Sequence, residues 1–256
     1  YYVNPAGTGQ LQRVGQFSSS YAGWTSGAAV FRPGKILQMG GNSNGAVVID
    51  INGPQPVVTA QPPMSSKRMW VSATTLADGR VVATGGSGVE NQLNDVNTSA
   101  EIWDPATGQW TVGPSGLKAR LYHSTALLLP DATVLVAGGG APGPLVNLHA
   151  EIYYPPYLYD ASGGFAARPV IATAPESVDA GQTFSMTVEP GSSIGRVTMV
   201  KTGSVTHSVN MDQRFVELPF TASGGTIFAT LPERATDTPP GYYLLFAFDD
   251  RGVPST

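Results

Sequence analysis

The chain contains no cysteine, little charge and no long apolar run, and each absence excludes a class of protein. Without cysteine the chain forms no disulfide and no thiolate metal site of its own. The absence of cysteine does not indicate whether the protein works in an oxidising or a reducing compartment. Charged residues make up 12% and the net charge is −4, so no basic surface for nucleic acid is expected. No apolar run approaches the roughly 18 residues that a membrane-spanning helix requires. The start at Tyr1 has neither methionine nor a basic segment, which predicts a processed or cut chain start.

Glycine and proline are abundant, with 31 and 21 residues among 256, and internal repetition accompanies them. Such a composition is typical of short strands joined by tight turns. Three segments share the layout strand, tight turn, strand and Gly-Gly: residues 27–41, 72–86 and 124–139. Their Gly-Gly pairs lie 45 and 53 residues apart, which matches the kelch period of about 50 residues. In the second segment Asp78-Gly79 predicts a two-residue hairpin loop, because glycine readily adopts positive φ.

Each Gly-Gly pair is followed by a variable loop and a third strand, and in the second repeat Gly108-Gln109-Trp110 begins a fourth strand. Four antiparallel strands per repeat make a propeller blade. Three blades cannot close a ring, which usually needs four to eight. We therefore expect residues 1–160 to form kelch-type β-propeller blades of a partial ring. The remaining blades would come from the rest of the protein or from a companion chain.

The repeat ends near residue 160, and a different strand pattern follows the Gly-rich linker 161–164. Alternating apolar segments recur without Gly-Gly pairs: 183–188, 196–200, 215–220, 226–231 and 242–248. Their spacing and the Gly-, Pro- and Ser-rich turns predict an immunoglobulin-like β-sandwich over residues 161–256. The whole chain is expected to be all-β, with one helical turn at most, near 233–235.

Several strings are similar to the galactose oxidase/glyoxal oxidase family of copper-radical oxidases. The matching strings are Arg120-Leu121-Tyr122-His123-Ser124, residues 147–159, residues 202–214, and residues 240–246 together with 252–255. The first resembles the family's Arg-x-Tyr-His-Ser motif, and the third resembles its Thr-His-x-x-Asn-x-Asp-Gln-Arg segment. The resemblance implies a secreted protein whose three blades are the last of a seven-bladed ring, followed by an immunoglobulin-like (E-set) domain.

The resemblance also implies a copper site and an activity. Carried over residue by residue, the metal ligands are Tyr122, His123 and His207, and Tyr122 is also the catalytic proton acceptor. The family's tyrosine–cysteine radical cofactor has no equivalent here, so it is expected outside this chain. An alternative alignment places Trp70 at the radical tyrosine, but Trp70 and Tyr122 are only 52 residues, or one blade, apart. The implied reaction oxidises a primary alcohol or small aldehyde with O2 and gives H2O2.

The residues themselves set conditions on such a site. Two imidazoles, a phenolate and a water suit Cu(II). Adjacent residues on a strand point to opposite faces, so Tyr122 and His123 can share a metal only where a strand begins or bulges. The third histidine, His149, is expected on the surface. Structural roles in turns and in bracing the His207 hairpin are expected for Arg68, Glu101, Arg120, Glu151 and residues 212–214.

Two other functions and the substrate stay open at this level. The chain could be a non-catalytic extracellular kelch binding or adhesion module, or its three ligands could hold a non-redox structural metal. The short loop 42–45 lacks the Tyr-Gln pair that the resemblance assigns to galactose-type substrate binding. Its absence favours a more open site for small aldehydes or alcohols. The loop 87–98, with Leu93, is expected at the rim of that site.

Overall fold

The computed structural model describes residues 2–4, 6–13, 23, 25–191 and 193–256, and it is all-β apart from one short 3-10 helix, η1 (Pro156–Leu158), among these residues. Tyr1, on which the expected chain start rests, lies outside the described residues. The segment 233–235 forms a turn rather than a helix, so the helical turn lies in η1 instead. A short hairpin, β1 (Tyr2–Asn4) and β2 (Gln10–Gln12), precedes the repeats.

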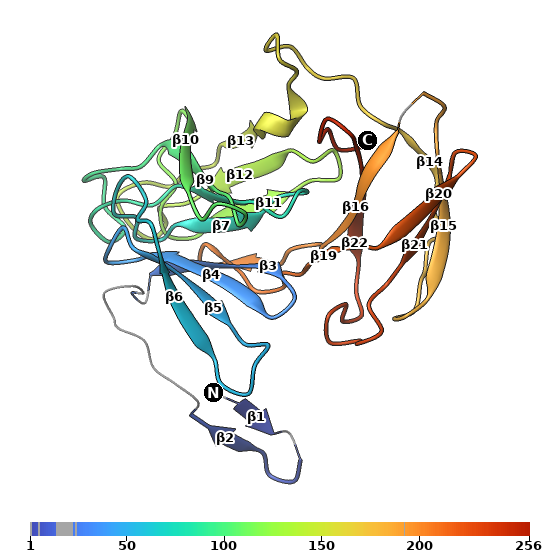
Figure 1. Cartoon of the computed structure of the whole chain (residues 1–256). Helices are drawn as coiled ribbons and strands as arrows, with labels where there is room; N and C mark the ends of the chain where they lie inside the picture. Colours follow the sequence, from blue (N-terminus) through green and yellow to red (C-terminus); the bar gives the residue numbers. More distant parts are fainter. Residues whose placement is uncertain (1, 5, 14–22, 24, 192) are drawn as a thin grey trace.

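Each of the three repeats forms one antiparallel sheet (Figure 1). The first blade contains β3 (Ser26–Arg32), β4 (Lys35–Gly40), β5 (Ala46–Asp50) and β6 (Val57–Gln61). The second blade contains β7 (Ser72–Thr75), β8 (Val81–Thr84), β9 (Ser99–Trp103) and β10 (Trp110–Ser115). The third blade contains β11 (Ser124–Leu128), β12 (Val134–Gly138) and β13 (Ala150–Tyr153). The innermost strands β3, β7 and β11 lie side by side, so the three blades stack as in a propeller.

The second blade is enclosed by its neighbours, and its sequence reflects this. Every residue of β7 and β8 is buried, because one face of this sheet packs on the first blade and the other face packs on the third blade. Strands buried on both faces are expected to carry continuous rather than alternating apolar runs. The apolar runs in the repeats therefore follow from blade stacking.

The β7–β8 loop corrects one detail of the sequence prediction. Leu76 N–H donates to the carbonyl of Arg80 and Gly79 N–H to the carbonyl of Leu76, so the loop holds three residues rather than two. Gly79 has φ +82°, the left-handed position that such a three-residue loop requires. A Cβ on Gly79 would lie 2.8 Å from the Phe215 ring of the C-terminal domain. Glycine is needed there both for the turn and for the domain contact.

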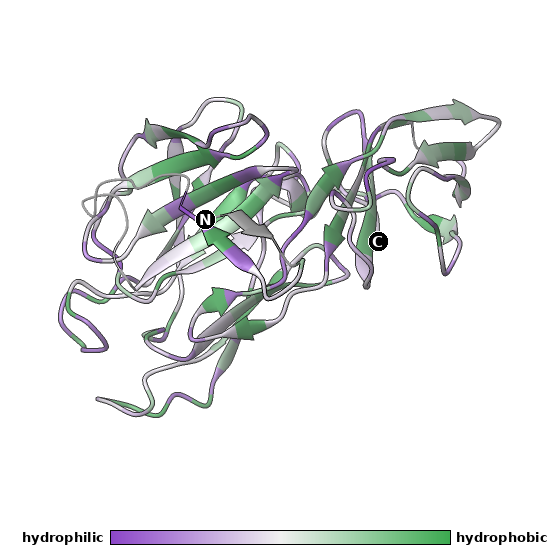
Figure 2. Cartoon of the chain, turned by 90° about the horizontal axis from the view of Figure 1, so that it is seen from below, coloured by the Kyte–Doolittle hydropathy of each residue, from purple (hydrophilic) through white to green (hydrophobic). Residues whose placement is uncertain are grey.

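Two packed sheets form the C-terminal domain. The outer sheet contains β14 (Ile171–Thr173), β15 (Thr183–Val188), β21 (Thr226–Thr230) and β20 (Phe220–Ser223), in that order. The inner sheet contains β19 (Phe215–Glu217), β16 (Ile194–Lys201) and β22 (Tyr243–Asp249). Met186, Val197 and Ala247 belong to the core between the sheets. Figure 2 shows apolar residues running along the strands of the blades and of this domain alike.

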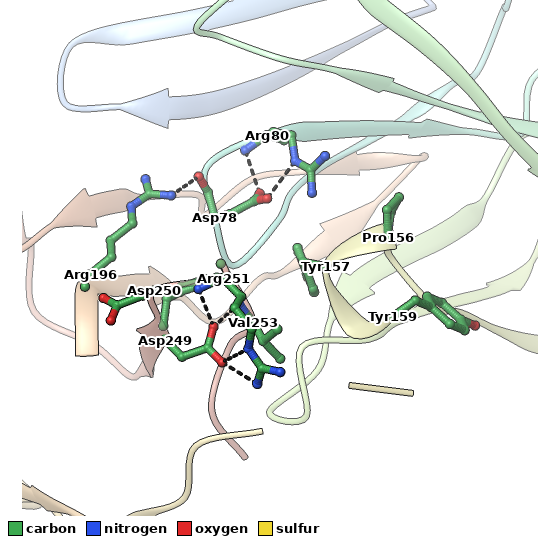
Figure 3. Close-up of a pocket in the computed structure, with 13 residues that line it drawn as sticks. Asp78, Arg80, Pro156, Tyr157, Tyr159, Arg196, Asp249, Asp250, Arg251 and Val253 are labelled. Carbon is green, nitrogen blue, oxygen red and sulfur yellow. Dashed lines mark hydrogen bonds and ion pairs between the residues drawn. The ribbon is translucent and has the colours of Figure 1, made fainter. Parts of the chain in front are cut away.

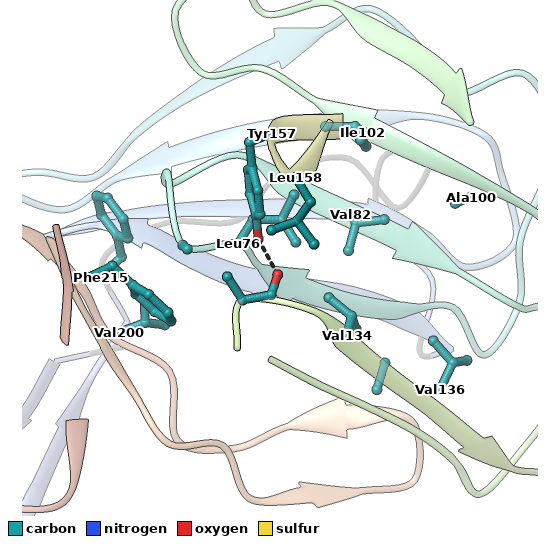
Figure 4. Packing of buried hydrophobic residues seen from close by; sticks show 14 of the residues in the cluster. Leu76, Val82, Ala100, Ile102, Val134, Val136, Tyr157, Leu158, Val200 and Phe215 are labelled. Carbon is teal, nitrogen blue, oxygen red and sulfur yellow. Dashed lines mark hydrogen bonds between the residues drawn. The ribbon is translucent and has the colours of Figure 1, made fainter. Parts of the chain in front are cut away.

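The inner sheet is apolar on its second face as well, and this face packs on the blades. Val200, Phe215, Phe246 and Phe248 join one buried cluster with blade residues and with η1 (Figure 4). The Thr198 hydroxyl also donates to the carbonyl of Ala77, at 2.7 Å. The blades and the sandwich thus share a core. Because the core is shared, the division of the chain into two domains at residues 160/161 stays a prediction.

Candidate metal centre

His207 lies at the tip of a hairpin that leaves the C-terminal domain. The hairpin strands are β17 (Val205–Thr206) and β18 (Val209–Asn210), and His207 and Ser208 form the two-residue turn. Both turn residues have positive φ, +55° and +64°, as a type I′ turn requires. Such a turn follows the right-handed twist of the strands, so the side chain of His207 projects from the end of a short, narrow hairpin.

Two buried side chains dock this hairpin on the innermost blade strands. The Ser208 hydroxyl lies 3.1 Å from the Ser124 hydroxyl and donates to the carbonyl of Leu121. Gln213 Nε2 donates to the carbonyl of Ala28 at 2.8 Å, and its Oε1 accepts from the Thr75 hydroxyl. The expected bracing by residues 212–214 is confirmed for Gln213, since it links the hairpin to two blades. A docked tip needs such partners because its buried polar groups no longer contact water.

Tyr122 and His123 occupy a turn just before β11. The Ser124 N–H donates to the carbonyl of Leu121, and His123 has φ +64°. This left-handed residue breaks the strand alternation, so adjacent side chains leave the backbone on one side. The Tyr122 and His123 rings stack, with 3.8 Å between centroids and 28° between planes. The structure therefore meets the geometric condition for both residues to approach one metal ion.

The three predicted ligands come together although two different domains supply them. The ring centroids of His123 and His207 are 4.6 Å apart, and those of Tyr122 and His207 are 5.4 Å apart. Both histidines are exposed and Tyr122 is half-buried. Among the described residues no group of three His, Cys, Asp or Glu side chains could hold a metal, so a site here depends on the phenol of Tyr122.

The hydrogen bonds of the two imidazoles define which nitrogen is available. His123 Nδ1 lies 2.7 Å from the carbonyl oxygen of Ala141, which can only accept, so Nδ1 carries the proton. His207 Nδ1 lies 2.6 Å from the Thr206 hydroxyl. In both residues the Nδ1 atom is used and the Nε2 atom is left for a metal. Metal-bound histidines usually use their second nitrogen in this way. The donor set of two imidazole nitrogens and one phenol oxygen fits Cu(II).

The repeated arginines and glutamates have the structural roles expected of them. Arg68 donates to the carbonyls of Gly85 and Ser99 and forms an ion pair with Glu101 at 2.8 Å. The side chains of this pair are 0% and 1% exposed. This buried charge pair, hydrogen-bonded to two backbone carbonyls as well, holds the turns of the second blade in one arrangement.

The third blade repeats this arrangement closer to solvent. Arg120 donates to the carbonyls of Gly138 and His149 and pairs with Glu151 at 2.7 Å. Burial tends to raise the pKa of Glu151, but the Leu117 N–H and Arg120 outweigh it and leave the pKa below the ordinary value. His149 is exposed, as predicted, and contributes its carbonyl rather than its ring.

One of the loops that follow the Gly-Gly pairs contacts the candidate ligands, and a second contacts that loop. Gly140 N–H donates to the carbonyl of Tyr122, which ties the loop 139–148 to the candidate ligands. Asn91 Nδ2 donates to the carbonyl of Pro142, so this loop contacts the loop 87–98 of the second blade. Leu93 on the latter loop is exposed, which is consistent with a rim position.

A groove elsewhere in the chain is a less suitable site for a ligand. It has a volume of about 600 Å³ and lies between the second blade, η1 and the C-terminal domain (Figure 3). Four of its charged side chains already pair with one another: Arg80 with Asp78, and Arg251 with Asp249. Arg196 donates to the carbonyl of Asp78. The Arg196 bond joins the C-terminal domain to the second blade, whereas the two ion pairs are local and occupy side chains that could otherwise bind a ligand.

The sequence did not identify one residue that contacts the candidate ligands, Trp70. Its ring centroid is 4.5 Å from that of Tyr122, and it is buried. A signal was present, since Trp70 follows Arg68 by two residues, as Tyr122 follows Arg120. Arg68 and Arg120 have the same role in their blades, so Trp70 and Tyr122 occupy the same position in successive repeats.

Comparisons with known proteins agree with this fold. Residues 168–256 match the family model of the galactose oxidase-like Early set domain, and residues 72–116 match that of the Kelch motif. A galactose oxidase of Gibberella zeae is 33% identical over 239 residues, which are 87% of this chain and 35% of that protein. Aldehyde oxidase GLOX1 of Arabidopsis thaliana is 30% identical over 81% of this chain and 37% of that protein. The chain thus spans about a third of the length of these relatives.

A solved structure matches nearly the whole chain. It is described as a novel fungal alcohol oxidase with catalytic diversity among the AA5 family, in complex with copper. It superposes with a TM-score of 0.92 and 28% identity, over 99% of this chain and 57% of that one. The chain is therefore similar to galactose oxidase and glyoxal oxidase over its kelch blades and its Early set domain, and the resemblance seen in the sequence is confirmed. Among the described residues no helix is long and apolar enough to cross a membrane.

Proposed function

We propose that this chain supplies the C-terminal half of the copper site of a secreted copper-radical oxidase. The enzyme would oxidise a primary alcohol or small aldehyde with O2 and release H2O2. The observation that carries the proposal is the convergence of Tyr122, His123 and His207, with the Nδ1 atom of each histidine already hydrogen-bonded. The copper in the matching alcohol oxidase and the names of the oxidase relatives support it.

At this site the two histidines would bind the metal and Tyr122 would accept a proton. His123 and His207 present Nε2 atoms as neutral donors, and the bonds from Nδ1 to Ala141 and Thr206 keep the rings in place. Copper bound there would supply Lewis acidity and one-electron redox chemistry. Tyr122, whose ring is stacked on that of His123, would take the hydroxyl proton of the substrate on its phenol oxygen as general base.

The remaining part of the reaction requires groups beyond this chain. Converting an alcohol to an aldehyde removes two electrons and two protons, and O2 accepts both to become H2O2. An aldehyde loses the same two electrons and two protons as its hydrate, in which water has supplied the added oxygen atom. Since the chain contains no cysteine, the tyrosine–cysteine radical that would take the carbon-bound hydrogen atom lies outside it on this proposal. The blades that would close the ring, in the same protein or a companion chain, are expected to carry that pair.

The test measures copper content and peroxide production in the intact protein. We expect one bound copper and H2O2 from primary alcohols or small aldehydes in a peroxidase-coupled assay. His123→Ala should lose copper, whereas His149→Ala, a matched change at an exposed histidine outside the site, should retain it. Bound copper without peroxide from any alcohol or aldehyde would favour a structural metal. An intact protein that binds no copper would favour the non-catalytic binding module.

A further inference from the structure

Trp70 stands in an unusual backbone conformation beside the candidate ligands. Its φ is +61°, a left-handed value that bulky side chains rarely adopt. In the next repeat His123 has a similar φ of +64°. At both positions the left-handed residue stands close before the innermost strand of its blade, β7 and β11. Strained conformations of this kind persist only where the surroundings impose them, and they cluster at functional sites.

The segment that holds Trp70 is fixed on both sides. The Trp70 N–H donates to the carbonyl of Thr25 in the first blade, and Met69 exchanges two backbone hydrogen bonds with Ser87. Arg68, immediately before them, is completely buried and paired with Glu101. Trp70 itself is only 8% exposed. Its indole ring therefore belongs to the rigid part of the second blade.

This rigid ring contacts the one candidate ligand that must also move a proton. The Trp70 and Tyr122 centroids are 4.5 Å apart with 57° between the planes, a favourable tilted aromatic contact. Tyr122 is only half-buried and no hydrogen bond to its hydroxyl is found among the described residues, so ring contacts are what orient it. The other two rings near Tyr122, those of His123 and His207, are both exposed.

We propose that Trp70 is a positioning residue for Tyr122. Its indole ring holds the phenol in the orientation that presents the hydroxyl oxygen beside the two imidazoles. The inference rests on the proposed function for its catalytic consequence, but the orientation of Tyr122 can be tested without metal. A smaller side chain at position 70 would leave space beside the phenol ring and permit it to rotate away.

The experiment compares Trp70→Ala and Trp70→Phe in the intact protein. Trp70→Gly replaces the alanine variant if that one does not fold, because glycine accepts positive φ without strain. Trp110→Phe is the matched control, since Trp110 is a partly buried tryptophan outside the site, bonded to the carbonyl of Pro62. The first measurement is a metal-free crystal structure of each variant, and the second is Cu(II) affinity by chelator competition.

In the metal-free structures, Tyr122 should leave its 3.8 Å stack on His123 in the alanine variant and keep it in the phenylalanine variant. Copper affinity should fall by about 10-fold in Trp70→Ala, the lower end of what losing an outer-shell partner costs. Trp70→Phe and Trp110→Phe should stay close to the wild type. In the active enzyme, Trp70→Ala should lower kcat more than it raises KM.

The two proposals fail in different ways. An unchanged Tyr122 ring in metal-free Trp70→Ala overturns the role of Trp70, whether or not the protein binds copper. So does wild-type copper affinity in a Trp70→Ala variant that folds. A wild-type protein that binds no copper refutes the proposed function, and the metal-free structures then still decide whether Trp70 orients Tyr122.

Discussion

Replacing His207 by alanine should separate metal binding from folding stability. The side chain is exposed, and its one hydrogen bond goes to the neighbouring Thr206 hydroxyl. Exposed substitutions usually change stability by no more than about 0.5 kcal/mol, and in a domain of this size about 1 kcal/mol shifts Tm by roughly 2–4 °C. We therefore expect the Tm of copper-free His207→Ala to lie within about 2 °C of the wild type.

Gln213→Ala supplies the opposite case from the same hairpin. Its buried amide donates to the carbonyls of Ala28 and Asn210 and accepts from the Thr75 hydroxyl. Removing it leaves buried polar groups without partners, which costs about 1–3 kcal/mol. The expected loss in Tm is about 4–8 °C for a cost near 2 kcal/mol. The side chain that docks the hairpin thus matters more for stability than the one at its tip.

Differential scanning fluorimetry of the copper-free intact protein gives both Tm values, and chelator competition gives copper affinity. His207→Ala should lose more than the roughly 100-fold affinity that an outer-shell change can cost, because it removes a ligand. The reasoning is refuted if His207→Ala unfolds the domain while the remaining folded protein binds copper normally. In that case His207 is a packing residue, and the hairpin is not a ligand-bearing arm.

Three further outcomes are expected. Arg68→Met should destabilise the protein by about 3–5 kcal/mol in denaturant unfolding, because it leaves Glu101 buried and unpaired. Arg120→Met should cost less, since 25% of the Glu151 side chain is exposed; equal losses would contradict this. The lowered pKa of Glu151 means that its contribution is present above the ordinary value of 4.5 and is lost as pH falls through the folded-state pKa, so Glu151→Gln should flatten the acid limb of a stability–pH curve. The isolated chain should produce no H2O2 from alcohols. Sustained peroxide production by the isolated chain would refute the proposal that the radical cofactor lies outside it.

Much of the fold could be predicted because the relevant signals are local. The Gly-Gly period gives the blades, since glycine tolerates the positive φ found at Gly40, Gly85 and Gly138. The loop at Asp78-Gly79 was recognised as a turn, but its length was wrong by one residue. Turn composition identifies a reversal of the chain, whereas the hydrogen-bonded pair that closes it depends on how the strands align.

The candidate ligands were named from motifs, but only the tertiary structure brings them together. His123 and His207 are 84 residues apart, and their meeting depends on Ser208 and Gln213 docking one domain on another. His123 has a left-handed conformation without being a glycine, so the residue type does not reveal this conformation in the sequence. Trp70 was considered only in the rejected alignment to the radical tyrosine, and its contact with Tyr122 was not predicted. The amino-acid sequence therefore determined the repeating blades and the chemistry of the ligands, because these follow from local backbone preferences and side-chain type. The tertiary structure decided the common centre and the indole ring beside it, because contacts between distant segments depend on packing that no local pattern encodes.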